Sequence, residues 1–269
     1  MLLRWKRLPK WQKQNKYIRS GYRKPSYSYY GSTRDIARWH NETVNIWSHL
    51  FAAIIFSWFL IRFLAQSGSL TLDVVAVATF FLGAIVCFTL SFVHHLLSNH
   101  SRRVMILTQR LDRFGTVTFI WSTVVSFLYF AFYLRPPITG ILHWRYNGSR
   151  SVHDAVFLSA NIQGSRKPSH AHIDFLRPRA LGNPTDDCLS PVLLASYRNL
   201  IILNAIGGFF YCMRIPERFC QDAFDIVGSS HQVMHIMVVA GALLYRAGLL
   251  SAGRAWQGEG ATGLPCPTG

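Results

Sequence analysis

Five apolar segments, each close to the length that crosses a lipid bilayer, most strongly constrain the fold of this chain. A helix needs about 20 mainly apolar residues to span the hydrocarbon core. The fourth segment is the weakest, because Arg198 and Asn199 interrupt its first half. We therefore predict an all-α fold, a polytopic bundle of about five transmembrane helices. The predicted spans are residues 44–64, 73–97, 114–134, 191–213 and 226–250.

Charged residues are few in this chain, but their net charge is strongly positive. Charged residues make up 15% of the sequence, against about a quarter in soluble domains, and the net charge is +16. Eleven Lys and Arg residues lie within residues 1–45, directly before and at the start of the first span. Because basic flanks of membrane spans face the cytoplasm, we predict a basic cytosolic arm over residues 1–43. The same argument predicts no binding of nucleic acid.

The later connections agree with a cytosolic N-terminus. Four arginines lie between residues 102 and 113, after the second span, whereas the outer connection 65–72 has no basic residue. We predict an integral, multi-pass protein of the plasma membrane or the endoplasmic reticulum. The transmembrane domain is expected over 44–250, followed by a disordered tail over 251–269.

One segment breaks this pattern. Residues 135–190 carry seven Lys and Arg against four Asp, although the predicted topology places them outside. Their sequence has neither helical nor strand periodicity. We interpret residues 135–190 as an aberrant polar segment that interrupts the transmembrane domain and contains no span. Basic residues without partners are too costly to bury in hydrocarbon.

A histidine pair in the last span is the first candidate for chemistry. His231 and His235 are four residues apart in a helical segment, so both project from one face. Such a pair can bind one metal ion, although it can also form a polar lining between packed helices. Ionisable residues inside a membrane span are costly and therefore point to a functional role.

Further polar residues are expected at the same side of the membrane. His94 and His95 end the second span, and Asp112 lies at the start of the third. Three histidines with an open position are typical of catalytic zinc, and a nearby carboxylate can take a proton from its water. Asp112 could instead be an interfacial or helix-capping carboxylate. His49, in the first span, is expected to be an ordinary hydrogen-bonding partner.

Several short motifs stand out along the chain. They are YIRSGYR at 17–23, HNET at 40–43, NIWSH at 45–49, SFVHH at 91–95, LDRFG at 111–115, RIPERF at 214–219 and SHQVMH at 230–235. With these motifs the chain resembles the progestin and adipoQ receptor family, which includes the adiponectin receptors and the hemolysin III group. The resemblance is greatest to its fungal members and covers roughly residues 15–134 and 197–248.

The resemblance implies a seven-helix fold with a cytosolic N-terminus and a Zn²⁺ ion near the cytoplasmic face. The implied metal ligands are His95, His231 and His235. His95 rather than His94 matches, because the family has a serine four residues before its ligand. Ser91 holds that position, beside the site, and Asp112 matches the family aspartate near the zinc-bound water. This chain departs from the family where two further spans are expected, within 135–190.

The implied function is a zinc-binding membrane receptor with a role in lipid and zinc homeostasis. The resemblance also implies a ceramidase-type lipid-amide hydrolase, with Asp112 and Ser91 as catalytic residues and ceramide or a fatty-acid-like lipid as ligand. An extracellular protein ligand is not identifiable from the sequence. Two alternatives remain: a non-enzymatic receptor with structural zinc, and a defective gene product. A hemolysin-type pore is the weakest reading, because no ring of pore-lining charge is visible.

Overall fold

The computed structural model describes residues 2–132 and 191–256, and within them the fold is almost wholly helical. No strand occurs in these two ranges, where Leu3 and Tyr22 form an isolated bridge. Within the described ranges, five helices are long and apolar enough to cross a membrane. They are α2 (Thr43–Gln66), α3 (Leu72–Leu97), α4 (Arg102–Phe132), α7 (Pro191–Met213) and α8 (Ser230–Trp256). The predicted all-α membrane bundle is therefore confirmed.

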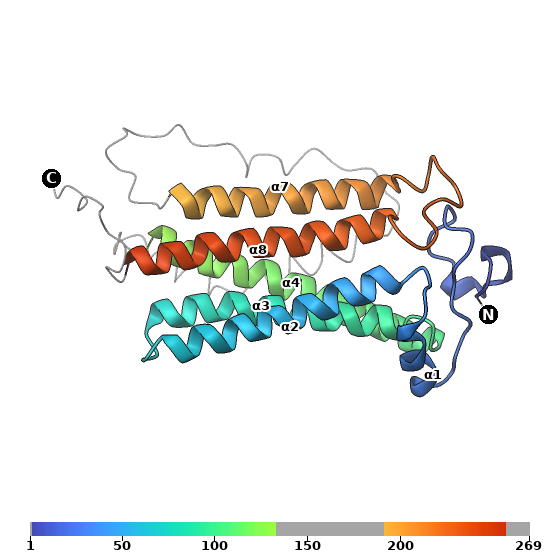
Figure 1. The fold of residues 1–269 in the computed structure, drawn as a ribbon, viewed down its shortest axis with the longest axis horizontal. Helices are drawn as coiled ribbons and strands as arrows, with labels where there is room; N and C mark the ends of the chain where they lie inside the picture. The colour runs from blue at the N-terminus through green and yellow to red at the C-terminus, as the bar shows by residue number, and fades with distance from the viewer. Residues whose placement is uncertain (1, 133–190, 257–269) are drawn as a thin grey trace.

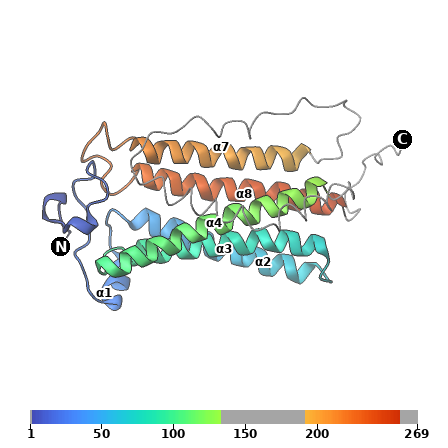
Figure 2. The ribbon, with the colours of Figure 1, turned by 180° about the vertical axis from the view of Figure 1, so that it is seen from behind.

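The long helices lie side by side along one axis, and successive helices in the chain run in opposite directions (Figure 1). α7 lies along α8, α3 lies along α4, and α2 packs on α3. Seen from behind, α4 crosses α3 obliquely (Figure 2). The end of α3, the start of α4 and the start of α8 all lie at the end that carries the N-terminal arm. This is the convergence that the alternation of spans predicts.

Two boundaries differ from the prediction. α4 begins twelve residues before the predicted start of the third span, at Arg102, so the connection after α3 is short. Its first three turns are rich in arginine, and hydropathy marks only the part of a helix that lies in hydrocarbon. α8 continues to Trp256, so residues 251–256 of the predicted disordered tail are helical. Most of the predicted aberrant segment, residues 135–190, lies outside the described residues.

The arm before α2 is folded against the bundle rather than extended. It contains short 3-10 helices over Trp5–Arg7, Lys10–Gln12 and Asp35–Ala37, and the helix α1 (Tyr29–Arg34). Ser28 caps α1 by accepting a hydrogen bond from the Gly31 amide. The sequence predicts that this arm is basic and on the cytosolic side of the membrane, but it does not predict that the arm is folded.

The apolar core lies between the helices and is rich in aromatic rings. Phe80 and Phe88 on α3 are fully buried, as are Phe56 on α2 and Tyr245 on α8. Small residues let the backbones approach, as is usual between membrane helices. A Cβ atom at Gly83 of α3 would collide with the side chain of Ser122 on α4. The α3–α4 contact therefore depends on the missing side chain at Gly83.

We predict that Gly83→Ala destabilises the protein by about 1–3 kcal/mol, because the added methyl group overpacks the α3–α4 contact. The matched control is Gly208→Ala on α7, where an added Cβ meets nothing within 4 Å. Thermal unfolding of the purified protein in detergent measures both variants. Equal melting temperatures for the two variants would contradict the close approach at Gly83.

Candidate metal centre

Three histidine rings from two helices face one another at the end of the bundle that carries the arm. His95 lies in the last turn of α3, and His231 and His235 lie in the first two turns of α8. One ring nitrogen from each lies within 4.8 Å of the others. His95 and His235 are 2% and 1% exposed, whereas His231 is partly buried and faces a cavity. The structure thus brings together the three residues predicted as metal ligands.

The hydrogen bonding of His95 leaves one of its two ring nitrogens free to bind a cation. Its Nδ1 lies 2.8 Å from Oε2 of Glu42, whereas its buried Nε2 has no hydrogen-bond partner. A carboxylate that accepts a hydrogen bond from Nδ1–H leaves the lone pair on Nε2, as in histidine ligands of metals. Nδ1 of His235 is also buried without a partner. These two free nitrogens, together with the neighbouring ring of His231, form a donor set that fits zinc.

Glu42 is the site residue that the sequence reasoning missed. It lies directly before α2, and its Oε2 also accepts a hydrogen bond of 2.8 Å from Asn45. Burial alone would raise the pKa of Glu42, but the hydrogen bonds from His95 and Asn45 hold its pKa well below the usual range. The carboxylate is therefore ionised and fixes the orientation of His95. A Glu at the boundary of a span is the sequence signal that could have identified it.

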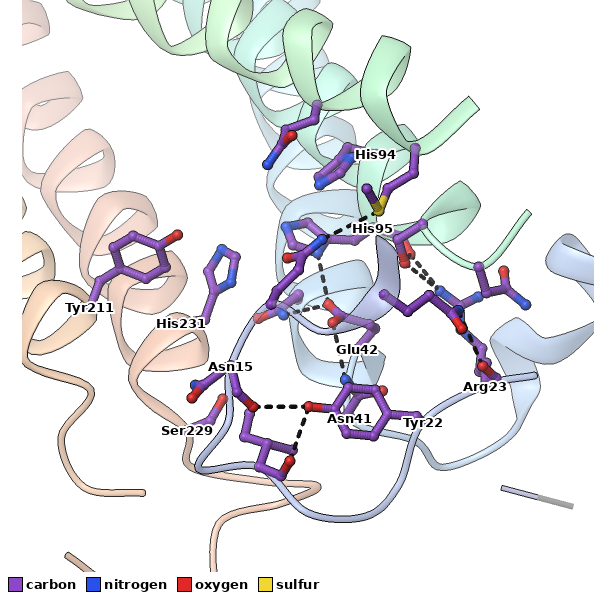
Figure 3. Close-up of a pocket in the computed structure, with 18 of the residues that line it drawn as sticks. Asn15, Tyr22, Arg23, Asn41, Glu42, His94, His95, Tyr211, Ser229 and His231 are labelled. Carbon is purple, nitrogen blue, oxygen red and sulfur yellow. Dashed lines mark hydrogen bonds and ion pairs between the residues drawn. The ribbon is translucent and has the colours of Figure 1, made fainter. Parts of the chain in front are cut away.

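His94 and His95 have different surroundings, although they are neighbours in the chain. Nδ1 of His94 lies 3.0 Å from the hydroxyl oxygen of Thr108 on α4, and His94 is not part of the converging set. Figure 3 shows His94 on the side of the pocket away from His231. The His94 side chain is therefore directed toward α4 rather than into the cluster.

His49, predicted to be an ordinary hydrogen-bonding partner, lies directly behind the histidine cluster. It is 4% exposed, and its ring nitrogens have the backbone of His235 as a marginal hydrogen-bond partner. Its ring stacks on His235, with centroids 3.9 Å apart, and meets the edge of Phe88. His49 therefore packs behind the histidine cluster, a placement that one helix's periodicity does not reveal.

The two predicted catalytic residues lie beside the cluster rather than within it. Ser91 is 3% exposed and precedes His95 by one turn of α3. The Asp112 carboxyl group is within hydrogen-bonding reach of the Ser91 hydroxyl group, and the charge of His95 acts on it. Because α4 begins at Arg102, Asp112 is well inside the helix and is not its N-cap. Asp112 contributes none of the three converging atoms.

The arm closes the end of the bundle and leaves a cavity of about 220 Å³ next to His95 and His231. Arg23 of the arm is buried, and donates hydrogen bonds of 2.6 Å to the His95 carbonyl and 2.9 Å to the Leu96 carbonyl. These carbonyls belong to the last turn of α3, which has no intrahelical donors for them. Burial lowers the pKa of Arg23 to about 10, so it stays protonated at neutral pH.

A second contact fixes the start of α8 to the same arm. The buried carboxylate of Glu217 accepts hydrogen bonds from the Asn15 amide group at 2.9 Å and from the Ser230 backbone at 2.8 Å. The Ser230 hydroxyl group also donates to it. His231 is the next residue, so Glu217 sets the position at which the second histidine enters the site. Figure 3 shows Asn15 and Ser229 on the wall below His231.

Fold and site together define an α-helical, multi-pass membrane protein with a buried histidine cluster at one end of its bundle. The family model described as Haemolysin-III related matches residues 37–145 and 192–245, which is more than half of the chain. The chain belongs to the Haemolysin-III related family, with the adiponectin-receptor-like membrane proteins among its relatives.

Three relatives illustrate the similarity. The chain is 31% identical to the adiponectin receptor protein of Drosophila melanogaster, over 91% of this chain and 58% of that protein. It is 30% identical to progestin and adipoQ receptor-like protein 1 of Caenorhabditis elegans, over 92% of this chain and 60% of that protein. It is 31% identical to ADIPOR-like receptor IZH2 of Saccharomyces cerevisiae, over 93% and 84%. The chain thus spans under two thirds of the fly and worm proteins.

We predict that Glu217→Ala lowers the free energy of unfolding by about 2–4 kcal/mol, because it leaves buried donors of Asn15 and Ser230 without an acceptor. The control is Asp222→Asn, which removes the charge of an exposed ion pair with Arg19 and keeps a residue type that tolerates the positive φ at this position. Thermal unfolding in detergent should show a clear loss for the first variant and little change for the second. Equal stability of both variants would contradict the role of Glu217.

Proposed function

We propose that this chain is a zinc-binding membrane receptor in which His95, His231 and His235 hold the metal ion. The observation that supports this proposal is the convergence of three ring nitrogens, from two helices, within 4.8 Å. The Glu42 carboxylate supports it further, because it selects the tautomer of His95 that leaves Nε2 free to bind. Zinc held in this way ties the cytoplasmic end of α3 to the start of α8.

The proposed orientation has the arm and the histidine cluster in the cytosol. It rests on the basic residues of the arm and of the start of α4, which lie at one end of the bundle. A change in the position of α8 relative to α3 would then be felt directly by the arm, through Arg23 and Glu217. We propose roles in lipid and zinc homeostasis for such a receptor.

Asp112 and Ser91 favour a second candidate, a ceramidase-type lipid-amide hydrolase. When bound, zinc supplies a Lewis acid that polarises a carbonyl group and makes nearby water more acidic. The Asp112 carboxylate, which neighbours His95, accepts a proton from the attacking water and returns it to the leaving amine. Ser91 holds the Asp112 carboxyl group in place for that transfer. Without this activity, the metal has a purely structural role.

We predict that His95→Ala and His235→Ala each lower the zinc content from about one ion per chain to well under half, and lower the melting temperature as well. Metal that bridges two helices also stabilises their contact. The control is His94→Ala, which removes a buried histidine bonded to Thr108 but no proposed ligand. Elemental analysis of the purified protein measures the zinc. Full zinc content in the His235→Ala variant would contradict the site.

We predict that Asp112→Asn lowers the rate of ceramide hydrolysis by about 10²–10⁴-fold while the zinc content is unchanged. The control is Asp73→Asn, which changes a carboxylate in the first turn of α3, at the far end of the bundle. Mass spectrometry of the released fatty acid measures the rate. An unchanged rate, or a loss of zinc, would contradict the assigned role of Asp112. A zinc-loaded wild-type protein that releases no fatty acid would leave the structural role of the metal.

A further inference from the structure

A second cavity, of about 430 Å³, lies between α1 and residues 23–26 of the arm, which precede this helix. Three exposed cationic side chains line it, those of Lys24, Arg34 and Arg38. The one acidic residue in its wall is Asp35, which forms an ion pair of 3.5 Å with Arg38. The cavity therefore carries a net positive charge. We refer to it as the α1 cavity.

The α1 cavity lies at the level where the transmembrane helices begin and end. α1 sits beside the end of α3 (Figure 1), and Tyr29 at its start packs on His100, with ring centroids 4.3 Å apart. The backbone amides of Ser26 and Tyr27 donate to the carbonyls of Asn99 and His100, in the short connection between α3 and α4. Consequently, the cavity opens at the membrane boundary rather than far out in the cytosol.

Aromatic side chains around the α1 cavity are unusually exposed. Tyr30 is 75% exposed and Trp39, in the cavity wall, is 67% exposed. Exposed Tyr and Trp rings close to the ends of membrane helices are typical of side chains that lie among lipid headgroups. An exposed Trp39 in the wall, with exposed Tyr30 on the neighbouring α1, favours a lipid over a soluble nucleic acid or an acidic protein segment.

The cationic groups indicate the chemistry of the ligand. Arginine side chains bind phosphate through paired hydrogen bonds, and lysine adds a point charge. Basic pockets at the cytoplasmic side of membrane proteins bind highly charged lipid headgroups. Three exposed cations and the buried Arg23 line this one cavity. They suit a headgroup with more than one phosphate better than they suit a single phosphodiester.

We propose that the α1 cavity binds the headgroup of a phosphorylated inositol lipid from the leaflet that the arm faces. The inference rests on the proposed cytosolic orientation, but not on zinc or on hydrolysis. Arg23 lines both this cavity and the cavity beside His95, where it donates to the His95 carbonyl. A bound headgroup would therefore be separated from the histidine cluster by one buried arginine.

The test measures binding of phosphatidylinositol 4,5-bisphosphate to the full-length protein in phosphatidylcholine nanodiscs, in which both leaflets are accessible. We expect saturable binding that the double variant Arg34→Gln, Arg38→Gln weakens by roughly tenfold or more. The control is Arg102→Gln, Arg103→Gln, which removes the same charge from the exposed start of α4, outside the cavity. Zinc content and melting temperature without the lipid should be unchanged in both double variants.

The outcomes separate the alternatives. Selective loss of binding in the Arg34, Arg38 variant supports the proposal, and equal loss in both variants would show general surface charge and overturn it. Equal binding of phosphatidylserine by the wild-type protein would overturn the requirement for several phosphates. A wild-type protein that binds no anionic lipid would overturn the proposal and point to an acidic protein segment as the ligand of the cavity. Because nanodiscs expose both faces, none of these results depends on the orientation or on the zinc proposal.

Discussion

Three histidine rings crowd together at one end of the helical bundle, and two of them, His95 and His235, are almost fully buried. Each of these two carries a ring nitrogen without a hydrogen bond, which costs about 1–3 kcal/mol. A cation shared by the three rings would remove this cost, and the hydrogen bond to Glu42 leaves Nε2 of His95 free to bind it.

The polar end of the bundle is built around this cluster. Arg23 satisfies the carbonyls at the end of α3, and Glu217 holds the start of α8, so both helices that carry the histidines are fixed to the same folded arm. Asp225 adds a third contact, because it accepts hydrogen bonds from the Arg19 backbone and the Ser20 hydroxyl group. The arm thus positions the site as well as covering it, and a ligand on the arm is placed to act on the site.

The sequence predicted the architecture well because hydrophobic length and helical spacing are local signals. The spans, the pairing of His231 with His235 and the convergence of helix ends all follow from residues close together in the chain. The separation of His94 from His95 came from a resemblance to a family rather than from spacing. The structure gives it a physical basis, since His94 bonds Thr108 while His95 bonds Glu42.

The parts that sequence reasoning missed depend on distant partners. Glu42 meets His95 across 53 residues, and Asn15 meets Glu217 across 202, so no local pattern reveals either contact. The start of α4 was missed because its first turns are polar, although they continue the same helix. The packing of the His49 ring on His235 was missed, because this contact has no signature in the periodicity of α2.

X-ray absorption at the zinc edge of the full-length protein probes the proposed metal centre itself. We expect about one zinc per chain, with three imidazole nitrogens at about 2.0–2.1 Å and one further light atom in a tetrahedral set. The spectrum of the His235→Ala variant should lose an imidazole contribution or the zinc altogether. A wild-type protein without zinc, or with sulfur in the coordination sphere, would contradict a metal centre formed by His95, His231 and His235.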